Sequence, residues 1–270
     1  MTESSSKRRR LEDPWLCDTC VDRKRPSDTL APYSNAAVKR AHRQWALHYV
    51  LNHPAPRPAV LYVDDRLPKA DNVDDWSYFT DDILATGRVQ SHQCFSPNLK
   101  LSVVQDLRER GLVHVEHSCA CQFLQRYASL IRDMYGGAVL AFIDVWGGFE
   151  TGARPVIEIS LALRLLNPSS SMVTFAASDR AARAQGQSSV TNYAIVQCQA
   201  QRMFEENKMR MTLVAPPEDM KVSSNTMQVH TWCVAAEKKE TNVKDAEELG
   251  AKSELHVQFK EEDEIGRAHV

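Results

Sequence analysis

Several polar or aromatic side chains of this sequence come directly after apolar segments. They are Asp64, Asp65, Asn98, Ser118, Cys119, Asp144 and Trp146. The carboxylates in this set can accept hydrogen bonds, remove a proton or bind a cation, and the amide, hydroxyl and thiol can contact a polar ligand. These residues can act in one site only if the fold brings the ends of their segments together, so the elements that carry them decide the chemistry.

The segment GGAVLAFIDVWGGF (136–149) gives the clearest indication of such an element. Its apolar run, 138–143, is unbroken, as expected of a strand covered by helices on both faces of a parallel sheet. Asp144 then stands at the carboxyl end of the strand, where open α/β sheets bind their ligands. Asp144 is therefore a candidate general base or a hydrogen-bond acceptor for a substrate amine, and the simpler alternative is a residue that caps the turn.

The other apolar segments predict a repeating order of strand and helix. They alternate with segments whose apolar residues recur at helical spacing, and the expected strands are 60–63, 89–95, 112–116, 138–143 and 172–176. This order is typical of a doubly wound α/β sheet with right-handed crossovers. Two further strands, 211–214 and 226–234, follow each other without a helix, which predicts that the mostly parallel sheet ends in an antiparallel β-hairpin.

Composition limits the class of protein. The chain has 270 residues, of which 43% are hydrophobic and 25% charged, and a formal net charge of −2. These values fit one soluble domain with tails and exclude a strong overall attraction to nucleic acid or to a membrane. Since no apolar run is long enough to span a bilayer and the polar N-terminus lacks a signal-peptide core, we expect an intracellular protein, cytoplasmic or nuclear.

The chain is expected to have three parts. We predict a disordered basic segment at 1–35, an α/β domain at 36–236 and a charged flexible tail at 237–270. The basic run 7–10 is a candidate nuclear-import signal or a solvated part of the tail. The last residues, 264–270 (EIGRAHV), resemble a translated sequencing adapter and are expected to be an artefact.

Two groups of residues have the chemistry of metal ligands. Cys17 and Cys20 form a Cys-x-x-Cys pair that can hold one side of a zinc ion, but no second pair follows nearby, so unliganded thiols are the alternative. The aspartates between Asp64 and Asp82 could bind magnesium. Because no phosphate-cradling glycine loop accompanies them, a solvated acidic loop is the preferred interpretation.

Five strand–helix units followed by an antiparallel hairpin resemble the class I S-adenosylmethionine-dependent methyltransferase fold over roughly residues 36–236. The resemblance lies in the order of the elements and in the polar residues at the strand ends. It implies catalytic roles for Asp144, which would orient or deprotonate the methyl acceptor, and for Trp146, which would stack on a flat substrate or line its pocket. The residues that it places on the cofactor side are Asp64, Asp65, Asn98, Ser118 and Cys119.

The chain departs from this family at three strand ends. The link 66–75 after the first strand has no glycine, Asn98 replaces the acid that accepts from the ribose hydroxyls, and Ser118-Cys119 replaces an Asp-Ala pair near the adenine. Two functions therefore stand as hypotheses. One is methyl transfer from S-adenosylmethionine; the other is a binding or scaffold module that has lost the cofactor loop. A further nucleotide-using Rossmann enzyme has less support, because Gly-x-Gly-x-x-Gly is also missing.

RNA or DNA is the partner suggested for the first hypothesis. The reasons are the basic N-terminal region and the cysteine pair, together with residues that could form a local basic surface or be simply solvated: Lys39, Arg40, Arg43, Arg180 and Arg183.

Overall fold

A computed structural model describes residues 36–64, 66–69, 72–143, 149–178, 186, 188–214 and 227–237. The strands are β1 (Ala59–Tyr62), β2 (Leu67–Lys69), β3 (Asn72–Ser77), β4 (Cys94–Asn98), β5 (His114–His117), β6 (Ala138–Ile143), β7 (Ser171–Ser178), β8 (Met209–Leu213) and β9 (Met227–Ala236). The α-helices are α2 (Ala36–Asn52), α3 (Phe79–Ala85), α4 (Leu101–Glu109), α5 (Ala120–Ser129), α6 (Arg154–Ala162) and α8 (Ser189–Glu206). Short helical turns are η1 (Ser91–Gln93), η2 (Leu130–Met134) and η3 (Phe149–Ala153).

These elements belong to the first of the two units into which the chain divides, Met1–Ala236 and Glu237–Val270. Within the described residues no helix combines the length and the apolar character of a membrane span.

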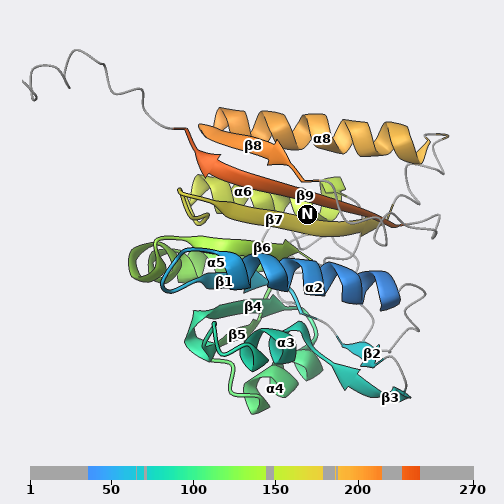
Figure 1. Ribbon diagram of the computed structural model, residues 1–270, viewed down its shortest axis with the longest axis vertical. Helices are drawn as coiled ribbons and strands as arrows, with labels where there is room; N and C mark the ends of the chain where they lie inside the picture. Colours follow the sequence, from blue (N-terminus) through green and yellow to red (C-terminus); the bar gives the residue numbers. More distant parts are fainter. Residues whose placement is uncertain are drawn as a thin grey trace, which may run out of the picture. The chain divides into compact units, whose positions relative to one another are not determined.

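Seven strands form one sheet in the order β5-β4-β1-β6-β7-β9-β8 (Figure 1). The pairs β4–β5, β1–β4, β1–β6 and β6–β7 are parallel, whereas β9 runs antiparallel to both of its neighbours, β7 and β8. The structure therefore confirms the predicted fold class, an α/β sheet that is mostly parallel and ends in antiparallel strands.

The centre of the sheet is covered on both faces. All six residues of β6 are buried, as expected from its unbroken apolar sequence. The residues of β1 alternate between two separate apolar clusters, and those of β6 are divided between the same two. One cluster is packed with α5, α6 and α8 and the other with α2, α3 and α4. In Figure 1, α2 crosses the sheet in front of β1 and β6. The core thus consists of two layers separated by the sheet.

Gly137 determines how the chain enters β6. Its φ is +100°, and a Cβ atom built there would lie 2.7 Å from the carbonyl oxygen of Leu166. Any other residue would meet both the left-handed backbone and the neighbouring main chain. The strand therefore needs glycine at this position to enter the sheet.

Two elements differ from the sequence prediction. The segment 89–95, predicted as a strand, contains the turn η1, in which the Gln90 N–H donates to Gln93 Oε1 at 2.9 Å, and the strand begins only at Cys94. The acidic loop after β1 contains the hairpin β2–β3, whose strands pair antiparallel. Its polar sequence has no apolar alternation to reveal it.

The hairpin is anchored at its base. Arg66, just before β2, donates from Nε to the hydroxyl of Tyr78 at 2.7 Å and to Asp106 Oδ2 at 3.0 Å. The Tyr78 hydroxyl itself donates to the same carboxylate at 2.5 Å. These contacts fasten both ends of the insertion to α4, so the hairpin has a fixed origin at the end of β1.

Candidate functional site

The strand order reverses between β1 and β6. From β1 the chain builds outward through β4 to β5, and it then returns to place β6 on the other side of β1. In doubly wound sheets, ligands bind outside the carboxyl ends of the strands at this switch point. Asp64 follows β1 here, and Asn98 and Ser118 stand at the ends of β4 and β5. We call this region the carboxyl edge.

Asp64 is buried at the carboxyl edge and fully engaged by the protein. Its carboxylate accepts from the backbone N–H of Phe79 at 3.0 Å, from the N–H and hydroxyl of Thr80 at 2.8 Å each, and from Arg43 Nη2 at 3.2 Å. Burial raises the pKa of Asp64, while Arg43 and the hydrogen bonds from Thr80 and Phe79 oppose that rise. Asp64 therefore holds the first turn of α3 and the helix α2 against the end of β1.

Asn98 links the ends of three strands. Its Nδ2 donates to the carbonyl oxygen of Asp64 at 2.5 Å, and its Oδ1 accepts from the N–H of Lys100 at 2.8 Å. The N–H of Ser118 donates to the carbonyl oxygen of Asn98 at 3.1 Å. One hydrogen of the Asn98 amide group is enough for the first contact, so the second is left for another acceptor.

Ser118 and Cys119 follow β5 and are both buried. The Cys119 Sγ atom accepts from the N–H of Gln122 at 3.5 Å and so caps the start of α5. Within the described residues, the Ser118 hydroxyl is one of only a few buried side-chain groups that have no hydrogen-bond partner. Because leaving a buried hydroxyl unpaired is unfavourable, Ser118, like the second amide hydrogen of Asn98, has spare capacity to bind a ligand at the carboxyl edge.

His117, the last residue of β5, contacts the protein itself. Its Nε2 lies 3.1 Å from the carbonyl oxygen of Leu99, an atom that can only accept. The imidazole thus joins the ends of β4 and β5.

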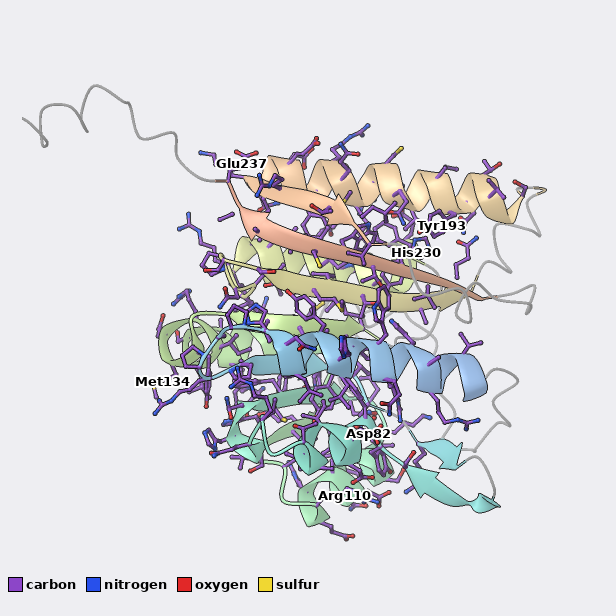
Figure 2. The ribbon with its side chains drawn as sticks, in the orientation of Figure 1. Asp82, Arg110, Met134, Tyr193, His230 and Glu237 are labelled. Atoms are coloured by element: carbon purple, nitrogen blue, oxygen red, sulfur yellow. The ribbon has the colours of Figure 1, made fainter. Side chains whose placement is uncertain are left out.

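The acidic segment does not assemble into a metal site in the described parts of the chain. Asp81 accepts from Arg110 Nε at 2.9 Å and from the N–H of Tyr78 at 3.0 Å. Asp82, labelled in Figure 2, is on α3 with Asp81. Burial raises the pKa of Asp82, and the charge of Arg43 on α2 opposes that rise. Among the described residues no group of three or more His, Cys, Asp or Glu side chains could hold a metal ion.

Five predicted residues lie outside the described residues, so the structure does not place them. They are the two cysteines of the zinc hypothesis and three candidates for ligand contact: Cys17, Cys20, Asp65, Asp144 and Trp146.

Arg43 is a residue of this region that the sequence interpretation missed. It was expected on an exposed basic surface, but only 3% of its side chain is exposed and it pairs with Asp64. The signal was present in the sequence, since Ala46, Leu47 and Val50 of the buried face follow Arg43 at three, four and seven residues. An arginine on this stripe must find an acceptor inside the fold.

The strand order, with an antiparallel β9 inserted between β7 and β8, defines a methyltransferase-like Rossmann fold. No protein-family model matches the sequence, and neither does any curated protein. Among solved structures, the chain is similar to the plantazolicin methyltransferase BamL, crystallised in complex with a triazolic desmethylPZN analog and SAH. The two chains are 9% identical, the match covers 76% of this chain and 87% of that one, and the TM-score is 0.42. The fold class rests on the strand order of this chain itself.

Proposed function

We propose that this protein transfers a methyl group from S-adenosylmethionine to an acceptor bound beside it at the carboxyl edge. The observation that carries the proposal is the buried Ser118 hydroxyl, which has no hydrogen-bond partner among the described residues and lies at the end of β5 in a sheet of methyltransferase-like order. In a protein that bound nothing here, this unpaired hydroxyl would destabilise the fold and serve no function. A ligand with a polar group at this position removes that destabilisation.

The cofactor side of the proposal uses groups of the carboxyl edge. Ser118 and Cys119 contact the adenine side of S-adenosylmethionine, and the second amide hydrogen of Asn98 is directed to the ribose. Asp64 acts by holding α3 and α2 in place, because its carboxylate already accepts from Phe79, Thr80 and Arg43. Asp65, next to it, is proposed as the carboxylate that contacts the ligand.

The acceptor side of the proposal uses the residues after β6. When bound, S-adenosylmethionine supplies an electrophilic methyl group on sulfur. Asp144 orients the acceptor or removes its proton, and Trp146 stacks on a flat substrate. Most of the rate enhancement then comes from alignment of the acceptor with the methyl group. RNA or DNA is the proposed acceptor, with the basic segment before α2 as its first contact.

A second candidate function is a binding or scaffold module without catalysis. It is favoured by the engagement of Asp64 within the protein and by the hairpin β2–β3, which occupies the place of a glycine-rich cofactor loop. The two functions differ in one measurable respect, because only the enzyme must bind S-adenosylmethionine.

Calorimetric titration of the full chain with S-adenosylmethionine and S-adenosylhomocysteine distinguishes them. The enzyme predicts saturable binding of both compounds. The Asp144→Asn variant should bind both with unchanged affinity but lose the transfer of labelled methyl groups to RNA or DNA. If the folded protein binds neither compound, the enzyme proposal fails and the scaffold function is favoured.

A further inference from the structure

A histidine stack, formed by His230, Phe175 and Tyr193, lies beside the end of β6. His230 on β9 is fully buried, and its ring is stacked between those of Phe175 of β7 and Tyr193 of α8. The ring centroids of His230 and Phe175 are 4.8 Å apart with an interplanar angle of 7°. Those of His230 and Tyr193, both labelled in Figure 2, are 4.6 Å apart with an angle of 16°. Phe175 is paired in register with both His230 and Ile143, the last residue of β6. The stack is therefore level with the strand end after which the acceptor is proposed to bind.

The neighbours of His230 determine which ring nitrogen carries the proton. Trp232 Nε1, which can only donate, lies 2.5 Å from Gln197 Oε1, and this contact fixes the orientation of the Gln197 amide. Gln197 Nε2 must then donate to His230 Nδ1, at 3.0 Å. Nδ1 is consequently unprotonated, and the neutral imidazole carries its proton on Nε2.

The Nε2–H of His230 has no acceptor among the described residues. Within the described residues, Nε2 is buried and has no hydrogen-bond partner. Gln197 lies one helical turn beyond Tyr193 from the start of α8. That start lies near the carboxyl edge, because Asn192 Nδ2 donates to Gln228 Oε1 at 3.1 Å and Gln228 is paired with Ala177 near the end of β7. Since the two ring nitrogens point to opposite sides of the imidazole, the side away from Gln197 is the one nearer the carboxyl edge.

The described residues that contact this imidazole ring are uncharged. Phe175, Tyr193, Gln197 and Trp232 contact the ring, and burial lowers the pKa of His230 to about 3, so the ring stays neutral at ordinary pH. A phosphate or carboxylate placed at Nε2 would be a buried charge without a counter-charge from these neighbours. A neutral lone pair has no such cost.

We propose that His230 donates from Nε2 to a neutral acceptor atom, a carbonyl oxygen or an unprotonated ring nitrogen, of the molecule that this protein methylates. The identity of that molecule as the methyl acceptor rests on the proposed function. For a nucleic acid, the contact would be with the edge of a base and not with the backbone phosphate. His230 then helps to select which group reaches the methyl donor, and Gln197 is the positioning residue that keeps the proton on Nε2.

Nuclear magnetic resonance of the full chain with ¹⁵N-labelled histidine tests the donor directly. We expect the His230 signals to show a proton on Nε2 and none on Nδ1. Pyridine and N-methylacetamide serve as probes for a ring nitrogen and a carbonyl oxygen, with acetate as the charged control. The Nε2–H signal should shift saturably with at least one neutral probe and not with acetate.

Two variants make the test specific. His230→Phe keeps an aromatic ring in the stack and should weaken binding of the neutral probe by about tenfold, the worth of one hydrogen bond. Gln197→Leu should leave His230 in place but give a mixture of tautomers. A proton on Nδ1 in the unaltered protein, or a Nε2–H signal that no neutral probe moves, would overturn the inference.

Titration with S-adenosylmethionine separates this inference from the proposed function. If S-adenosylmethionine binds and neutral probes leave His230 unaffected, the inference fails while the proposed function stands. If probes bind at His230 and S-adenosylmethionine does not bind, the methyltransferase proposal fails while the ligand chemistry assigned to His230 stands.

Discussion

Ser118→Ala should make the protein more stable and a weaker binder of S-adenosylmethionine. The Ser118 hydroxyl is buried, with the residue 3% exposed, and has no hydrogen-bond partner in the part of the chain that the structure describes. An unpaired buried polar group destabilises a protein by about 1–3 kcal/mol. Removing the hydroxyl relieves this destabilisation, but the small cavity left by its oxygen atom offsets part of the gain. We therefore expect the free energy of unfolding to rise by about 1 kcal/mol. Loss of one hydrogen bond to the cofactor should lower its affinity about tenfold.

Ser96→Ala is the matched control for this change. The Ser96 hydroxyl is also buried and has no hydrogen-bond partner among the residues that the structure describes, but Ser96 lies inside β4, two positions before the strand ends at Asn98. Urea unfolding should show a similar gain in stability for both variants, and calorimetry should show weaker cofactor binding for Ser118→Ala alone. A Ser118→Ala protein that is less stable and binds S-adenosylmethionine as before would refute the reasoning, because the hydroxyl would then serve the fold.

Three further predictions concern the fold and can be checked by urea unfolding. Asp64→Asn should lower the free energy of unfolding by about 3–5 kcal/mol, because it leaves the buried Arg43 guanidinium without its counter-charge. Glu158→Gln, at the exposed pair with Arg154, should lower it by no more than about 0.5 kcal/mol. Equal effects would contradict the structural role of the buried pair. Gly137→Ala should destabilise far more than Gly136→Ala, because both have positive φ but only the first would clash with main chain; similar losses would argue against the close approach. Burial lowers the pKa of His230 from 6.5 to about 3. Between these pH values the unfolded chain binds a proton that the folded protein does not bind, so the stability present above pH 6.5 is lost as the pH falls. The stability of the unaltered protein relative to His230→Phe should thus fall by about 1.4 kcal/mol per pH unit between these values, and a pH-independent difference would contradict the burial.

Most of the sheet could be predicted because its strands have strong local signals. The residues of β6 are apolar without interruption, and the sequence has no helical pattern between the segments of β8 and β9, which predicts the antiparallel pairing that these strands have. The hairpin β2–β3 could not be predicted in the same way. Its pairing is made by main-chain hydrogen bonds in a polar segment, and its position depends on Arg66 and Tyr78 meeting Asp106, which is 28 or more residues away along the chain.

For the candidate site, the positions of the residues could be predicted but their hydrogen bonds could not. Sequence position alone predicts that Asp64, Asn98 and Ser118 lie at the carboxyl ends of neighbouring strands, and the hydrogen bonds among them place them there together. It cannot predict which of the three is already satisfied by the protein. That depends on distant partners such as Arg43, and the tautomer of His230 likewise depends on a glutamine of α8 and a tryptophan of β9.

The place of β9 in the sheet has a consequence for synthesis on the ribosome. β7 is paired along all of Ser171–Ser178 with β9, and β8 also borders β9, yet β9 is the last of these strands to be translated. Until residue 236 has emerged, a nascent chain carries two strands whose shared neighbour does not yet exist, and such open edges favour association between chains. A chain that stops before residue 227 would keep both edges open permanently, so we expect it to precipitate or to be held by chaperones.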